Sequence, residues 1–444
     1  MKDEDSVVYI EELLESRRFN EAKPLLIEQL KKNKNLPSVY NGLAIIALEK
    51  DQNAHQAEKY YHLALELEKN SEILHFNLGF LYEEFLNDLN KAKYHYEQAI
   101  LIKPDYIDAL TNSVELMLEL EEEDDLIVEY CKKISEIDPE NPRNLNNLGY
   151  LMMKKEKNYE EAIKYFEKAI LFASDPAIIL GNLADAYAKN QCFEEALQTY
   201  KKALTIDPNN ALLCFNYAAL LWQQVKDYDE AIIYYKKFIT LEPENIFAYR
   251  ALRSIYGYEL EDSKSAVESL EKALIYFKND SELLLEIANI YEYELRDYKK
   301  AKKYYLRILE INPNQIEALS ALGFLSAEIF EEYNQGIDYY MKILELTPKA
   351  VEPYMNLAHL YFYNLKKYIK AQEYYEKAKK LIKNDKKSFD LISEIYYNLG
   401  MIYEQIHNEK EIAIYYYEYL VEKNNDEQAK RKLISLYQKN PVIH

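Results

Sequence analysis

The chain of 444 residues carries 55 basic and 76 acidic side chains, a formal net charge of −21. This charge repels nucleic-acid phosphates and anionic lipid surfaces, so we expect neither nucleic acid nor membrane among its partners. Gly and Pro contribute only 8 and 12 residues, a composition that suits helices and excludes long parallel-sheet domains.

The sequence carries few signals for targeting or for disulfide formation. The start is acidic, and the sequence has neither a signal-peptide pattern nor an uninterrupted apolar run of ~18 residues that would span a membrane. Cys131, Cys192 and Cys214 share no ligand-like spacing and do not form a disulfide framework. We therefore expect a cytoplasmic protein.

One residue pattern recurs along the chain, and its anchor is usually alanine. Ala196, Ala231 and Ala266 are each 35 residues apart. The twelve anchors are Ala22, Ala57, Ala92, Leu126, Ala162, Ala196, Ala231, Ala266, Ala301, Gly336, Ala371 and Ala413. Four residues after each anchor stands a large, usually aromatic side chain, here called the large slot. Small and large residues at this spacing share one face of a helix.

A second helix is predicted before each anchor, around another small residue that we call the small slot. Small slots are Gly79, Gly149, Ala184, Ala218, Ala288, Gly323, Ala358 and Gly400, and each lies twelve or thirteen residues before its anchor. Two helices approach closely only where a small residue leaves room, so the large slot should fill the space opposite. Prolines such as Pro104 and Pro208 mark where the second helix of a pair ends.

In chain order, three places depart from the regular pattern. The fourth repeat has Val114 and Leu126 in its small positions and an acidic run, residues 121–125, in its turn. Extra residues are expected around 381–394, between Ala371 and Ala413. The stretch 429–438 places Leu433, Ile434 and Tyr437 on one face and predicts the capping helix that an open-ended repeat array needs.

These positions resemble the signature of the tetratricopeptide repeat family, in particular an array of the bacterial type. The signature is legible in Leu148-Gly149, Ala162, Phe166 and Ala169, and again in Leu183-Ala184, Tyr187, Ala196, Tyr200, Ala203 and Pro208. The resemblance implies an all-α, right-handed superhelical solenoid of about twelve helix-turn-helix repeats plus the cap, as one domain over residues 1–444. Most repeats here carry one extra residue, expected in the turn between the two helices, as in 87–90.

The resemblance also implies that the first helix of each pair lines a concave groove. Two residues before the small slot, five successive repeats carry an asparagine: Asn77, Asn112, Asn147, Asn182 and Asn216. A row of amides can pair with the backbone of an extended peptide without reading its sequence, similar to the asparagine ladder of such arrays. The alternative is that asparagine is common at this family position and bonds locally or to water.

The other groove-facing columns lie six and three residues before, and one, four and five residues after, the small slot. They hold seventeen acids against four bases, Arg143, Lys154, Lys189 and Arg250, which predicts an acidic groove. In the middle repeats these columns turn aromatic and apolar, at Tyr150, Met153, Ile178, Leu212, Phe215, Trp222, Phe247 and Tyr258. Packing between repeats is the alternative for some of these, and Trp222 is the expected anchor of a bound partner.

Catalytic motifs are missing from the sequence. It has no Gly-rich phosphate loop, nucleophile elbow or metal-binding histidine motif, so we expect no enzyme, no cofactor and no metal site. The expected function is a scaffold that holds an extended, basic and partly apolar protein or peptide segment in its groove. The alternative is a structural repeat protein that assembles with copies of itself, and the sequence leaves the oligomeric state open.

Overall fold

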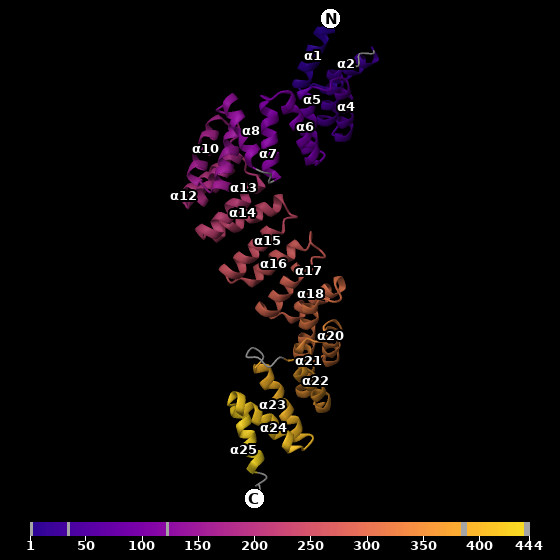
Figure 1. The fold of residues 1–444 in the computed structure, drawn as a ribbon, viewed down its shortest axis with the longest axis vertical. Coiled ribbons are helices and arrows are strands. Elements are labelled where there is room, and N and C mark those ends of the chain that lie inside the picture. The colour runs from indigo at the N-terminus through magenta and orange to yellow at the C-terminus, as the bar shows by residue number, and fades with distance from the viewer. Residues whose placement is uncertain (1–2, 33–35, 121–123, 383–388, 439–444) are drawn as a thin grey trace. The chain divides into compact units, whose positions relative to one another are not determined.

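The structure is a computed structural model that describes residues 3–32, 36–120, 124–382 and 389–438 (Figure 1). All regular secondary structure in these ranges is helical, which confirms the all-α class. The chain divides within α14 into two compact units, Met1–Ala231 and Ile232–His444. The single continuous solenoid and its right-handed superhelical course stay predictions.

The first unit alternates first and second helices of successive repeats. They are α1 (Asp3–Glu15), α2 (Phe19–Lys31), α3 (Pro37–Glu49), α4 (Ala54–Leu67), α5 (Glu72–Glu84), α6 (Leu89–Ile102), α7 (Ile107–Glu119), α8 (Asp124–Ile137), α9 (Pro142–Leu151), the π-helical turn η1 (Met152–Glu156), α10 (Tyr159–Phe172), α11 (Ala177–Lys189), α12 (Phe193–Ile206), α13 (Ala211–Leu220), η2 (Leu221–Val225) and the start of α14 (Tyr228–Leu241).

The second unit continues the alternation. Its helices after α14 are α15 (Ile246–Ser254), η3 (Ile255–Glu259), α16 (Ser263–Ala273), α17 (Ser281–Asn289), η4 (Ile290–Glu294), α18 (Tyr298–Ile311), α19 (Ile316–Phe324), η5 (Leu325–Ile329), α20 (Tyr333–Leu346), α21 (Val351–His359), η6 (Leu360–Asn364), α22 (Tyr368–Leu381), α23 (Phe389–Gln405), α24 (Lys410–Asn424) and α25 (Glu427–Gln438).

Short polar side chains start many of these helices. The carboxylate of Asp88 accepts the backbone N–H of Lys91 at the start of α6, and Asn53 does the same for α4. Such caps satisfy amide groups that have no partner inside the helix. In the second helices that have such a cap, it helps to fix where the helix begins, and hence where its large slot lies.

The extra residue of the longer repeats lies at the end of the first helix. Where the small slot and anchor are thirteen residues apart, as in Ala288 and Ala301, a bond joins Asp297 N to Tyr291 O across six residues, after η4. Where they are twelve apart, in α11, Cys192 N bonds Tyr187 O across five. The prediction that the turn holds this residue is therefore wrong for six repeats, which take it up as a π turn, η1 to η6, whereas the example at 87–90 lies between α5 and α6 without a π turn.

A left-handed residue then closes every joint between paired helices that the structure describes in full. Within the described ranges, twelve non-glycine residues have φ between 49° and 66°: Arg17, Gln52, Asn87, Lys157, Gln191, Lys226, Glu261, Arg296, Glu331, Lys366, Asn408 and Asn425. All but Asn425, which follows α24, lie between the two helices of a pair. The backbone geometry of the repeat therefore recurs as regularly as its sequence.

The small and large slots meet as expected. A Cβ added at Gly79 would lie 2.6 Å from the ring of Tyr96, and one added at Gly149 would lie 2.7 Å from Phe166. Tyr96 and Phe166 are fully buried. The small residue is thus required by the ring opposite it.

Two glycines in the second unit should respond oppositely to alanine. A Cβ at Gly323 would lie 2.6 Å from Tyr340, which is buried, so Gly323→Ala should lower the free energy of unfolding by about 1 kcal/mol. At Gly257 a Cβ would meet only Ala266, at 3.6 Å, so Gly257→Ala should raise it by about 0.5–1 kcal/mol through helix propensity. Urea unfolding of both variants measures this, and a change of the same sign in both would contradict it.

The departures from regularity are partly visible. Residues 121–123 of the acidic run and 383–388 of the expected insertion lie outside the described residues, between α7 and α8 and between α22 and α23. The predicted cap is α25, which buries Ala429 and Leu436 with Leu420 of α24. Its exposed side differs from the expectation, since Ile434 is 55% exposed.

Candidate functional site

Four of the large-slot tyrosines donate hydrogen bonds to carboxyl groups of the first helices. Tyr305 Oη donates to Glu292 Oε2 at 2.7 Å, and Glu292, four residues after its small slot, is buried. The same kind of pair joins Tyr96 to Glu83, Tyr200 to Asp185 and Tyr417 to Glu404. Where the large slot is Phe166, the matching position four after Gly149 is Met153. In these four repeats a core hydroxyl is therefore bonded to a carboxyl group of the first helix, a pairing that charge counting missed.

Burial changes the acidity of these groups. It raises the pKa of the Tyr305 hydroxyl, which therefore stays protonated and donates. Burial also raises the pKa of Glu83 and of Asp185, although both accept a tyrosine hydroxyl. Some of the carboxyl groups counted on the groove-facing columns are therefore hydrogen-bonded to tyrosines of the core.

The first hollow lies in the first unit, between α3 and α9, and has a volume of about 430 Å³. Its acidic lining residues are Glu49, Glu83, Glu84, Asp108 and Glu115. Phe76 and Phe80 add aromatic surface, and Arg143 is the only cation in the lining. A guanidinium of the chain itself therefore occupies a mostly acidic site.

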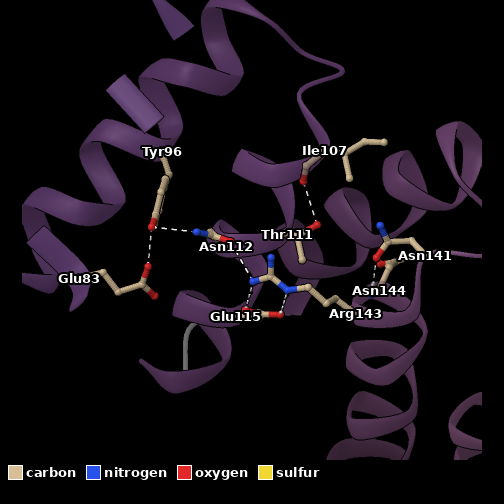
Figure 2. A network of polar contacts seen from close by, with 9 residues as sticks. All are labelled: Glu83, Tyr96, Ile107, Thr111, Asn112, Glu115, Asn141, Arg143 and Asn144. Carbon is tan, nitrogen blue, oxygen red and sulfur yellow. Dashed lines mark hydrogen bonds and ion pairs between the residues drawn. The ribbon is translucent and has the colours of Figure 1, made fainter. Parts of the chain in front are cut away.

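Arg143 is held there by two groups, as Figure 2 shows. Its Nε and Nη2 donate to the carboxylate of Glu115, and Nη2 also donates to Asn112 Oδ1 at 2.8 Å. Asn112 Nδ2 in turn donates to Tyr96 Oη at 3.0 Å, and Tyr96 donates to Glu83. This chain of bonds demonstrates how carboxylate and amide oxygens of the groove-facing positions grip a guanidinium.

The second hollow, of about 580 Å³, is also in the first unit and carries the opposite charge. Its lining includes Lys154, Lys157 and Lys189, with Asp185 as the single acid. Asp185 accepts bonds from Tyr200 and from Asn216 Nδ2. The acid excess of the columns is therefore not uniform along the repeats.

The third hollow lies in the second unit, between α17 and α21, and has a volume of about 710 Å³. Its acids are Glu292, Glu317 and Glu352, and its lining, all of it in described residues, contains no Lys or Arg. Tyr293 and Phe324 are 69% and 44% exposed. This hollow combines carboxylates with open aromatic faces.

The asparagine column lies at the seam between successive first helices. Asn77 Nδ2 donates to Asn41 Oδ1 at 3.0 Å, and Asn182 Nδ2 donates to Asn146 Oδ1 at 2.8 Å, in each case across 36 residues. Asn216 reaches Asp185 in the same way at 3.3 Å. In the free chain these amides therefore bond from repeat to repeat, and their role in peptide binding stays a prediction.

Two members of the column are buried. Asn112 is 7% exposed and bonds Tyr96 and Arg143, as described above. Asn147 is 4% exposed, and its amide nitrogen has no hydrogen-bond partner among the described residues. A bound backbone could reach Asn147 only if the surrounding side chains moved.

The aromatic candidates differ in exposure. Tyr150 lines the second hollow. Phe215 and Trp222 are half-buried. Tyr258 is 68% exposed, and the guanidinium of Arg253 lies 4.3 Å from its ring centre. Of these four candidates, Tyr258 offers the most open aromatic surface.

Arg250 is engaged with acids of the next repeat. Its Nε lies 3.2 Å from Glu286 Oε2, and its Nη2 lies 3.7 Å from Glu282. Like Arg143, it is a groove-facing base paired within the chain. A partner that used Arg250 would have to compete with these carboxylates.

The described ranges contain neither a metal-binding cluster nor a helix that could span a membrane. No cluster of three or more His, Cys, Asp or Glu side chains there has a geometry suited to a metal ion. None of the helices in those ranges combines the length and the apolar character of a membrane span.

Comparison with protein families identifies the repeats. Tetratricopeptide repeat models match residues 74–106, 142–176, 177–210, 211–245, 281–315 and 351–385. The chain belongs to the tetratricopeptide repeat family, as the resemblance implied.

Two curated relatives share stretches of this kind. The chain is 27% identical over 197 residues to human "Protein O-mannosyl-transferase TMTC3", covering 44% of this chain and 19% of that protein. It is 30% identical over 149 residues to a UDP-N-acetylglucosamine--peptide N-acetylglucosaminyltransferase of Giardia intestinalis, covering 33% and 10%. The matched parts thus span about a fifth or less of these relatives.

Solved structures with similar architecture are more distant. PilW, a type IV pilus biogenesis factor, gives a TM-score of 0.43 at 20% identity over 48% of this chain and 96% of that one. The human IFIT1 dimer with PPP-AAAA gives 0.45 at 17% identity over 82% and 87%. At these identities the likeness concerns the fold alone.

Proposed function

We propose that this chain is a protein-interaction scaffold whose groove-facing columns hold an extended, basic and partly apolar segment of another protein. Tetratricopeptide repeat proteins generally bind proteins or peptides, and the family membership supports this class. The proposal does not assign the chain an enzymatic step.

The observation that carries the proposal is the exposure of large side chains on these columns. In the second unit Phe247, Tyr258 and Tyr293 are 67%, 68% and 69% exposed, and in the first unit Ile178 and Leu212 are each 63% exposed. Single exposed apolar residues are ordinary, but a set that recurs at fixed repeat positions beside carboxylates supports a docking surface.

A labelled peptide tests this function. The probe is a fluorescein-labelled peptide of about 15 residues with alternating Arg and Leu between Gly and Ser, which at ~3.3 Å per residue passes several repeats. We expect binding by anisotropy that Tyr258→Ala with Tyr293→Ala weakens by about tenfold, since exposed aromatic residues act as anchors. Absence of binding at any attainable concentration would overturn the proposal.

Salt provides a second readout of the same complex. Screening shortens the Debye length from ~10 Å at about 0.1 M to ~3 Å at about 1 M, so affinity should fall over this range if carboxylates attract the segment. A flat or rising affinity would instead favour an apolar ligand.

Self-assembly is the second candidate, because the same exposed side chains could contact another copy of the chain. Light scattering over a range of protein concentrations distinguishes the two. A mass that rises with concentration, and that falls to the monomer value in the Tyr258→Ala, Tyr293→Ala variant, would favour assembly.

A further inference from the structure

The first and third hollows occupy the same positions of the repeat. Glu83 and Glu292 both stand four residues after a small slot and both accept a large-slot tyrosine hydroxyl. Asp108 and Glu317 both stand six residues before the next small position, Val114 and Gly323 respectively. The two hollows therefore share a carboxyl framework, one in each unit.

The first and third hollows differ at the repeat position that carries the arginine of the first hollow. Six residues before Gly149 stands Arg143, the guanidinium of the first hollow, and six before Ala358 stands Glu352. The acid that grips Arg143, Glu115, is replaced in the third hollow by Phe324. The third hollow thus keeps two of the carboxyl positions and gains Glu352, has the aromatic Tyr293 and Phe324 where the first has Glu84 and Glu115, and lacks the internal guanidinium of the first (compare Figure 2).

The side chains of the third hollow are suited to bind a guanidinium that another molecule supplies. Glu317 and Glu352 are exposed and can each accept two hydrogen bonds from a planar guanidinium. The open faces of Tyr293 and Phe324 can stack on it, which a compact ammonium group does less well. Asn356 adds a further amide at the edge.

We propose that the third hollow binds an arginine side chain of the partner segment, with Glu317 and Glu352 as its acceptors and Tyr293 and Phe324 as its stacking surfaces. This inference rests on the proposed function and specifies one side chain of the ligand. Arg143 in the first hollow is the precedent for it within the same chain.

The test compares three peptides, the arginine probe above and versions with every arginine replaced by citrulline or by lysine. Citrulline keeps the shape of the side chain and removes its charge. We expect Glu317→Gln with Glu352→Gln to weaken binding of the arginine probe by about tenfold and to leave citrulline binding unchanged. The matched control, Glu345→Gln with Glu373→Gln, makes the same change in net charge at exposed positions outside the hollow and should have little effect.

A second variant fills the hollow from within. Glu352→Arg places at this position the group that the first hollow has, so it should abolish the arginine dependence while thermal melting stays unchanged. A probe that binds the parent chain equally well with arginine and citrulline, or that ignores both variants, would overturn the inference and leave the scaffold function standing. Equal binding of the lysine peptide would overturn the preference for guanidinium, and no binding by any peptide would overturn the proposed function itself.

Discussion

Replacing Tyr305 by phenylalanine is expected to lower the free energy of unfolding of the second unit by about 1–3 kcal/mol. The hydroxyl donates to Glu292 at 2.7 Å and lies 2.8 Å from Asn289 Oδ1, and Glu292 is only 4% exposed. Removing the hydroxyl leaves the buried Glu292 carboxyl group without this donor. The desolvation of that group is then no longer compensated, and this is the main loss of stability. Urea unfolding followed by circular dichroism measures the loss.

The chain itself suggests the compensating change. Because Phe166 occurs naturally with Met153, Tyr305→Phe combined with Glu292→Met should recover most of the lost stability. The control is Tyr61→Phe, since Tyr61 is buried and its hydroxyl has no hydrogen bond in the described structure, so the change should be nearly neutral. Additive losses in the Tyr305, Glu292 double variant would show that the pair does not act as a unit.

A pair of buried histidines should make the first unit less stable in mild acid. His75 Nδ1 lies 3.0 Å from His95 Nδ1, and both rings are 6% exposed. One nitrogen can donate only while the other accepts, so the contact needs at least one neutral ring, and burial disfavours the charged form of both. The titratable and charged side chains around the pair are Glu58 and His62 of α4, Tyr82 of α5, and Lys91 and Tyr94 of α6.

The sign of the pH effect follows from the direction of the shifts. Burial, followed by repulsion from His75, lowers the pKa of His95 to about 4, and burial also lowers the pKa of His75. An unfolded histidine titrates near ~6.5, so the full stability is present above that pH and is lost as the pH falls toward about 4. For His95 alone, the loss between about pH 7 and pH 5 is about 2 kcal/mol.

Hydrogen exchange of α5 and α6, expressed as protection factors, measures this loss locally. The variant with His75→Leu and His95→Leu has no such pair and should keep its protection between the two pH values. Equal loss of protection in the parent chain and in this variant would assign the effect to other groups.

The repeat architecture could be predicted from sequence because its determinants are steric and periodic. Gly79 requires a large ring opposite and Tyr96 supplies it, and the same spacing recurs along the chain. The position of the extra residue could not be predicted in this way. A π turn and a longer turn need the same number of residues, so the spacing alone cannot distinguish them, and only the backbone of the folded chain does.

The candidate site was less predictable. Column counting found an excess of acids at the expected groove positions, and it could not tell that Glu83 and Glu292 are bonded to core tyrosines, because that depends on where each tyrosine hydroxyl lies in the folded chain. It also treated Asn147 as accessible, whereas the structure buries it. This column lies at the seam between repeats, where the amides contact the preceding repeat before any ligand.

The π turns also bear on how such a chain can change length over evolutionary time. One residue more or fewer at the end of the first helix converts the spacing of Ala288 and Ala301 into that of Ala184 and Ala196. The faces on which the small and large slots lie are the same in both kinds of repeat. Single-codon insertions and deletions at this joint are therefore absorbed locally, whereas the same events inside α17 or α18 would rotate every later side chain of that helix by about 100°. The joint is where related chains should differ in length by one residue.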